Sequence, residues 1–164
     1  MTNRQTAVLV AVAVVAGSVV AGVGLATQGS GKPSRVVQID EDNGRIGSVV
    51  LGETRENVYG VLGKPRDAGY GPGATLIYGH MRVGLRHGRV VSITTDDPAA
   101  RTLNVVRIGD PLSAARALYR KAAHCIPNSP DKTAKHPHCR ITVPAGLLLI
   151  AGDPIETMTL TRAG

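Results

Sequence analysis

The sequence predicts an α+β fold of two tandem α-β-β-β units, with antiparallel sheet packed by short helices, after an N-terminal apolar helix. Two observations support this. Residues 49–54 (Val-Val-Leu-Gly-Glu-Thr) and 106–111 (Val-Arg-Ile-Gly-Asp-Pro) are alike, since each carries an apolar residue, a glycine and an acid before a short amphipathic segment. Strand-like runs follow both segments, which is typical of two copies of one supersecondary unit.

These observations divide the chain into four parts. We expect a signal peptide or membrane anchor over residues 1–26, a linker over 27–44, a first unit over 45–97 and a second unit over 98–164. Each unit alone is near the lower size limit for independent folding. We therefore expect the two units to share or abut hydrophobic faces.

The N-terminal run from Ala7 to Gly24 contains a single polar residue, Ser18. As a helix it would be about 27 Å long, close to the thickness of a bilayer's hydrocarbon core. Small residues at Gly24 and Ala26 stand where a signal peptidase requires them. Two interpretations stay open, a cleaved signal and a retained anchor that attaches the protein to the membrane through residues 7–25, and a buried core helix is a third. No cysteine lies near Ala26, which excludes a lipobox.

The chain has two cysteines, Cys125 and Cys139. Downstream of an export signal, such a pair indicates one disulfide in an oxidising compartment. The loop of about 15 residues that it would close contributes on the order of 3 kcal/mol. The sequence thus predicts a protein that is secreted, or anchored to the cytoplasmic membrane with its C-terminal domain outside.

The composition excludes one class of partner. The formal net charge is +7, but the basic residues are scattered, and there is no Phe or Trp to stack on bases. Nucleic-acid binding usually combines a massed basic patch with aromatic platforms. We expect no nucleic-acid partner, a solvated basic surface, and a core of Val, Leu, Ile and Ala.

The first unit begins with a short helix. Thr54 is a good N-cap, and Glu56 lies in the first turn, where the helix dipole favours a negative charge. An apolar i, i+3, i+4 stripe at positions 58, 61 and 62 follows, and a glycine and a proline at 63 and 65 end the helix. His87-Gly88 is suited to a tight hairpin turn. The strand candidates are Thr75–Tyr78, Met81–Arg86 and Arg89–Thr95.

The second unit repeats this order. Asp110 is the expected cap, Pro111 the first helical residue, and the helix runs from Leu112 to Ala123. A proline-containing loop over residues 126–137 follows. The strand candidates, which Pro/Gly turns separate, are Cys139–Val143, Leu147–Ala151 and Ile155–Arg162.

Residues 47–58 and the ending Leu-Gly-Lys-Pro at 62–65 resemble the opening motif of β-lactamase-inhibitor-protein-like and SmpA/OmlA-like modules. The resemblance is best in residues 46–95 and implies short helices packed on an antiparallel sheet. The second unit lacks the Leu-Gly-x-Pro ending, although its cysteine pair is similar to disulfides of the secreted inhibitors. Those inhibitors grip enzymes with an aromatic-rich concave sheet face. This chain offers Tyr78 and little else there, so we expect no tight β-lactamase inhibitor.

The densest polar cluster consists of His124, Cys125, His136, His138 and Cys139. Sulfur and imidazole could bind zinc or copper, but the spacing matches no standard zinc pattern. We favour a structural disulfide decorated by histidines and expect no cofactor. A metal-handling envelope protein that uses the His/Cys loop 124–139 is the alternative function.

No catalytic constellation is evident. The chain has no Gly-x-Ser-x-Gly elbow, and Asp96-Asp97 is typical of a strand-ending turn rather than of a catalytic pair. An exported hydrolase is a third possibility, supported by no motif.

The sequence therefore predicts an exported or membrane-anchored, non-enzymatic module that binds an envelope or extracellular protein. Alternation in one strand suggests that contact occurs through the sheet face opposite the helices. The residues expected to project there are Tyr78, His80, Arg82 and Arg86.

Overall fold

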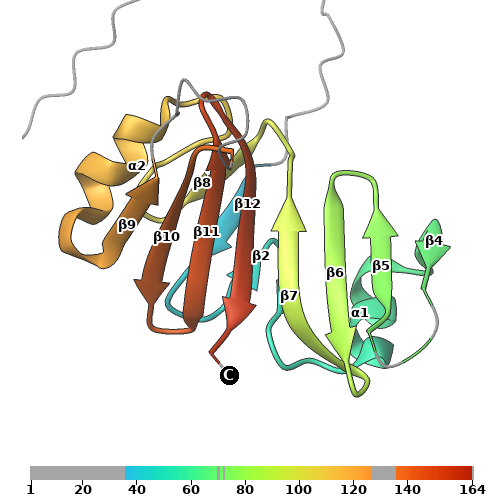
Figure 1. Ribbon diagram of the computed structural model, residues 1–164. Coiled ribbons are helices and arrows are strands. Elements are labelled where there is room, and N and C mark those ends of the chain that lie inside the picture. Colours follow the sequence, from blue (N-terminus) through green and yellow to red (C-terminus); the bar gives the residue numbers. More distant parts are fainter. Residues whose placement is uncertain (1–35, 70, 72, 127–135, 164) are drawn as a thin grey trace, which may run out of the picture. The chain divides into compact units, whose positions relative to one another are not determined.

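The computed structural model of the protein describes residues 36–69, 71, 73–126 and 136–163. These residues belong to one compact unit. Figure 1 shows its elements. The strands are β1 (Val37–Asp40), β2 (Arg45–Ile46), β3 (Val49–Val50), β4 (Asp67–Ala68), β5 (Thr75–Tyr78), β6 (Met81–Arg86), β7 (Arg89–Thr95), β8 (Ala100–Thr102), β9 (Ala123–Ile126), β10 (His138–Val143), β11 (Gly146–Gly152) and β12 (Ile155–Arg162). The helices are α1 (Arg55–Leu62), α2 (Leu112–Tyr119) and the 3₁₀ turn η1 (Arg120–Ala122).

The main sheet has eight antiparallel strands in the order β4-β5-β6-β7-β12-β11-β10-β9. Its two halves meet where β7 pairs with β12, from Thr95 opposite Met158 to Ser92 opposite Thr161. A smaller sheet has the order β3-β2-β1-β8, with β1 and β8 parallel. The described part of the chain is thus mostly β-sheet with two short helices, in agreement with the predicted α+β class. The last strands of the two predicted units join edge to edge, and a single hydrophobic core contains residues of both.

The hydrophobic core lies on one face of the main sheet. Strict alternation in β6 and β10 buries Val83 and Leu85 of one strand and Cys139 and Ile141 of the other. Val58 of α1 is fully buried in the same core, as are Leu112 and Ala115 of α2. Helix α2 packs on β9, β10 and β11. The helices therefore cover the face that alternation predicts to be apolar.

Several local signals in the sequence are confirmed. The Thr54 hydroxyl accepts a hydrogen bond from the backbone N–H of Asn57, as an N-cap should. Strands β5, β6, β7 and β12 have the predicted bounds. The hairpin turn between β6 and β7 has positive φ at both His87 (51°) and Gly88 (75°), which matches the right-handed twist of the strands.

The start of α2 differs from the prediction. Pro111 is the N-cap, and the Asp110 carboxylate instead accepts from the N–H of Arg107 at 2.8 Å. The N–H of Leu112 donates to the Asp153 carboxylate at 3.0 Å, from the turn between β11 and β12. The helix is also shorter than predicted, because it ends at Tyr119 and the chain turns through η1 into β9.

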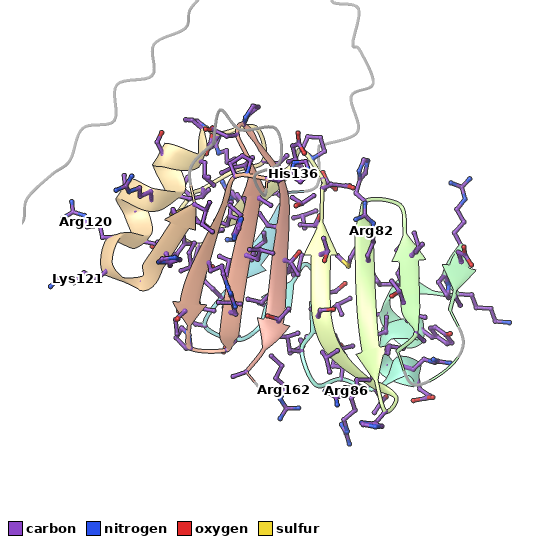
Figure 2. All side chains as sticks on the ribbon, viewed as in Figure 1. Arg82, Arg86, Arg120, Lys121, His136 and Arg162 are labelled. Atoms are coloured by element: carbon purple, nitrogen blue, oxygen red, sulfur yellow. A yellow bond between two sulfur atoms is a disulfide. The ribbon has the colours of Figure 1, made fainter. Side chains whose placement is uncertain are left out.

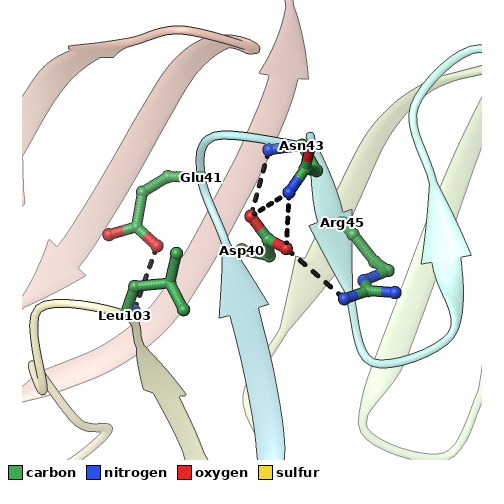
Figure 3. A network of polar contacts seen from close by, with 5 residues as sticks. All are labelled: Asp40, Glu41, Asn43, Arg45 and Leu103. Carbon is green, nitrogen blue, oxygen red and sulfur yellow. Dashed lines mark hydrogen bonds and ion pairs between the residues drawn. The ribbon is translucent and has the colours of Figure 1, made fainter.

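Part of the predicted linker is folded. Val37–Asp40 forms β1, in which Ile39 is fully buried. The Asp40 carboxylate accepts from Asn43 and pairs with Arg45 at 3.4 Å (Figure 3). Hydrogen bonds from Asn43 hold the pKa of Asp40 below its usual value. The boundary at residue 44 was wrong because these polar and glycine-rich residues meet their partners only in the folded chain.

Glu41, also within the predicted linker, is 3% exposed. Its carboxylate accepts from the N–H of Leu103 at 3.0 Å (Figure 3) and from the side chains of Asn104 and Tyr119. Burial and the hydrogen bond to Glu41 raise the pKa of Tyr119 far above its usual value. One carboxylate therefore ties β1 to the loop after β8 and to the end of α2.

No helix in the described residues is long and apolar enough to cross a membrane. The predicted apolar helix lies in residues 1–35, outside the described part.

Candidate functional site

The candidate site is the face of the main sheet that points away from the helices, which we call the open face. The strand registers place one side chain from every strand in a single row across it. The row reads Asp67, Ile77, Arg82, Thr94, Thr159, Leu149, Arg140 and His124. Figure 1 views the sheet from this side, with α1 behind it. In the described residues both helices pack on the other face.

Hydroxyl groups line the middle of the open face. Thr94 and Thr159 hydrogen-bond through their Oγ1 atoms at 3.0 Å where β7 meets β12. In the neighbouring row, Ser92 lies opposite Thr161, whose hydroxyl donates to the carbonyl of Leu147. Such hydroxyls can both donate and accept, so this strip can pair with polar groups of either kind.

One flank of this strip is cationic but paired. Arg82 donates to Asp96 at 3.0 Å, and His80 Nδ1 lies 2.7 Å from the other oxygen of the same carboxylate. Both basic side chains remain more than half exposed, at 51% and 64%. Asp96, predicted to form only a strand-ending turn, thus holds two predicted site residues together and offsets the charge of Arg82.

The other flank is cationic without an acid beside it. A shallow hollow of about 520 Å³ lies over β9 and β10 and is lined by both cations and small residues. Its lining is Lys121, Ala122, Ala123, His124, Arg140, Thr142 and Leu147. No carboxylate lines this hollow in the described part of the chain, and no salt bridge reaches Arg140 there. This hollow is therefore suited to bind an anionic group.

Tyr78 does not belong to the open face, contrary to the prediction. It shares the face of Leu76, which is buried, and its hydroxyl donates to the carbonyl of Gly63 at 3.1 Å, where α1 ends. Burial, with a smaller contribution from Tyr59, raises the pKa of Tyr78. The alternation used for prediction was that of β6, and its phase does not transfer across the turn at residues 79–80 to β5.

Arg86 lies on the open face, as predicted, but far from Arg82 along the strand (Figure 2). It stands directly opposite Arg89, whose guanidinium donates to the carbonyl of Gly52 at 3.0 Å. Arg89, Arg162 and Asp42 line a separate hollow of about 550 Å³. The structure therefore brings His80 and Arg82 together and leaves Arg86 at another end of the sheet.

Cys125 and Cys139 form the predicted disulfide, at directly opposed positions of β9 and β10. No thiolate is therefore left for a metal. His124 and His138 lie on the open face, and His138 Nδ1 bonds to the carbonyl of His136. No group of three or more potential metal ligands occurs among the residues that the structure describes, while residues 127–135 of the loop lie outside them.

The sequence reasoning missed Arg140, Thr94 and Thr159. For Arg140 a signal existed, because it lies between Cys139 and Ile141, two inward residues of a predicted strand. For the threonine pair none existed, since the two residues are 65 positions apart.

Comparison with known proteins adds a fold likeness. No family model matches the sequence, and no curated protein matches it significantly. The structure is similar to that of an extracellular protein containing an SCP domain from Bacillus anthracis str. Ames, with a TM-score of 0.54 and 11% identity. The alignment covers 68% of this chain and 44% of that one, so this chain spans less than half of that protein's length. At this identity the likeness concerns the fold alone.

Proposed function

We propose that this protein is an exported, non-enzymatic module that binds an envelope or extracellular protein through its open face. The observation that carries this proposal is the row of side chains from Arg82 to His124, which crosses the main sheet with hydroxyls at its centre and cations on both sides. A site built on strands is held more precisely than a site built on loops, which favours recognition through this sheet.

The chemistry of the flanks indicates the kind of surface that is bound. Asp96 offsets the charge of Arg82, whereas the hollow of Lys121, His124 and Arg140 has no lining acid in the described residues. Complementary charge speeds association and selects partners more than it adds affinity. We therefore infer a partner whose acidic patch meets the β9–β10 flank, next to polar groups that pair with the threonine strip.

Part of this proposal concerns the fold. Helix α1 precedes β4–β7 and helix α2 precedes β9–β12, which supports two tandem units whose last strands meet. The antiparallel sheet with short helices on one face also supports kinship with the β-lactamase-inhibitor-protein-like modules. The open face differs from theirs in this chain, because its described residues include no aromatic side chain.

The cellular location is part of the proposal as well. A Cys125–Cys139 disulfide is expected in an oxidising compartment, which supports export. Whether residues 7–25 are cut or retained decides between a secreted and a membrane-attached protein. The intact mass of the protein purified from the native host distinguishes the two.

Photocrosslinking in intact host cells tests the binding face. A benzoylphenylalanine in place of Leu149, which is half-buried at the centre of the open face, should give one discrete protein adduct. The same group in place of Ser113, exposed on α2, serves as the control and should not. The double variant Arg140→Glu and His124→Glu should abolish the adduct at position 149. Equal adducts from both positions, or none from position 149, would refute the proposed face.

The metal-handling alternative now depends on imidazoles alone, since the disulfide uses both sulfurs. Titration of the intact, oxidised protein with zinc tests it. Stoichiometric binding that is lost in a His124→Ala and His138→Ala variant would favour this alternative over the protein-binding proposal.

A further inference from the structure

The loop that connects β8 to α2 exposes two apolar side chains near its start. Leu103 is 46% and Val105 is 54% exposed, with the exposed Asn104 between them. We call residues 103–105 the apolar tip. It lies outside the open face, because β8 belongs to the smaller sheet.

The backbone of the apolar tip is strained at its most exposed residue. Val105 has φ = 69°, in the left-handed region that β-branched residues strongly disfavour. Glycine or asparagine would adopt this conformation at less cost. The chain instead has an asparagine one position earlier, at Asn104, and a valine at the strained position. The Val105 side chain is exposed, so no packing contact in the described fold compensates for the backbone strain.

The rest of the loop holds this strained conformation in place. The N–H of Val105 donates to the Thr102 carbonyl at 3.0 Å, and the N–H of Val106 donates to the Thr102 hydroxyl at 3.2 Å. From below, the buried Glu41 carboxylate binds the N–H of Leu103 and the side chain of Asn104. A strained backbone conformation that neighbouring hydrogen bonds hold in place is typical of a functional site.

Two basic residues lie beside the tip. Arg101 and Arg107 flank it and face each other in an antiparallel bridge. Two acids lie close to the tip: Glu41, which is buried and hydrogen-bonded to Leu103 and Asn104, and Asp110, which accepts from the N–H of Arg107. In the ranges that the structure describes, no salt bridge neutralises either arginine.

We propose that the apolar tip docks on an anionic lipid surface, with Leu103 and Val105 at the level of the acyl chains and the flanking Arg101 and Arg107 at the headgroups. Two apolar side chains are too small for a stable protein interface, which needs about 800 Å² from each partner. They suffice for an interfacial contact that basic residues reinforce, because arginine stems reach along apolar surface while their heads stay at the charged layer. A second copy of the chain would instead bring like charges together.

The sequence permits this contact in a membrane-attached protein. Residues 25–35 separate the predicted apolar helix from Val36 and span at most about 40 Å when fully extended. A retained helix would thus keep the tip close to a bilayer, where weak docking suffices. This role is independent of the open face, and either proposal can fail without the other.

A single tryptophan reports on docking, because the natural chain contains none. Full-length Leu103→Trp is reconstituted into vesicles of phosphatidylcholine, with or without phosphatidylglycerol, that contain phosphatidylcholine with brominated acyl chains. Val61→Trp is the matched control, since Val61 is also apolar and 52% exposed but lies on α1. Far-UV circular dichroism verifies that both variants are folded.

We expect the bromines to quench the Leu103→Trp variant in phosphatidylglycerol vesicles, with a blue-shifted emission, and to leave the Val61→Trp variant unquenched. Adding Arg101→Gln and Arg107→Gln to the Leu103→Trp protein should weaken docking roughly 30-fold, at about fivefold for each basic residue near an anionic surface. High salt should act in the same direction. Three results would overturn the proposal. They are equal quenching of the two variants, no quenching of the tryptophan at the tip, and a blue shift of its emission that depends on protein concentration instead of lipid.

Discussion

Truncation of Glu41 should destabilise the protein by about 3 kcal/mol, although the residue belongs to what the sequence presents as a linker. In a Glu41→Ala variant, the Tyr119 hydroxyl loses a charged partner in a half-buried position, which costs about 1–2 kcal/mol. The N–H of Leu103 loses less, about 0.5 kcal/mol, because it also donates to the carbonyl of Ile39 at 3.1 Å. The lost packing of one methylene group, Cγ, adds about 0.8 kcal/mol.

Urea unfolding of the full-length chain, kept soluble by a nonionic detergent and followed by circular dichroism, measures this change in free energy. Glu41→Gln keeps the packing and one acceptor oxygen, so it should cost about half as much. Glu56→Ala, on the exposed face of α1, is the surface control and should cost less than about 1 kcal/mol. A double-mutant cycle with Tyr119→Phe should show a coupling of about 1–2 kcal/mol. A cost for Glu41→Ala no larger than that of the control would refute the reasoning.

Three further predictions follow from the described contacts. Replacing Cys125 and Cys139 by Ser should lower the melting temperature by roughly 10 °C, since the disulfide is worth about 3 kcal/mol; an unchanged melting curve would contradict this. Tyr78→Phe should cost about 1 kcal/mol in urea unfolding yet leave the adduct at position 149 unchanged, because its hydroxyl bonds to the helix side. Asp40→Asn should be destabilising at pH 7 but progressively less so below about pH 4. Folding lowers the pKa of Asp40, so the stability that this carboxylate contributes is present above the unfolded pKa and is lost as the pH falls through the folded pKa. A cost of the substitution that does not depend on pH would exclude a stabilising role for the ionised carboxylate.

Much of the secondary structure could be predicted from short-range signals. Strands β5, β6, β7 and β12 and the start of α1 agree with the prediction because their determinants, strict alternation, a Thr54 cap and a His-Gly turn, act within a few residues. The errors occur where a distant group decides. Asp110 is a good local cap for α2, but the Asp153 carboxylate occupies that role from 41 residues away.

The candidate site was only partly predictable for the same reason. Alternation in β6 correctly pointed Arg82 and Arg86 outward, and the cysteine pair correctly predicted a disulfide. Tyr78 was assigned to the wrong face because the phase of one strand was extended to its neighbour. Asp96 was predicted to form a turn, which gave no indication that it would pair with both His80 and Arg82.

By itself, the sequence determined the class of fold, the positions of most strands and the disulfide, because propensity, alternation and turn chemistry are local properties. Only the tertiary structure decided which strands are neighbours and which side chains meet. Thr94 and Thr159 are 65 residues apart, and Glu41 and Tyr119 are 78 residues apart. Such contacts depend on the pairing of β7 with β12 and on the packing of β1 beside β8, and a periodicity read along the chain contains no information about either.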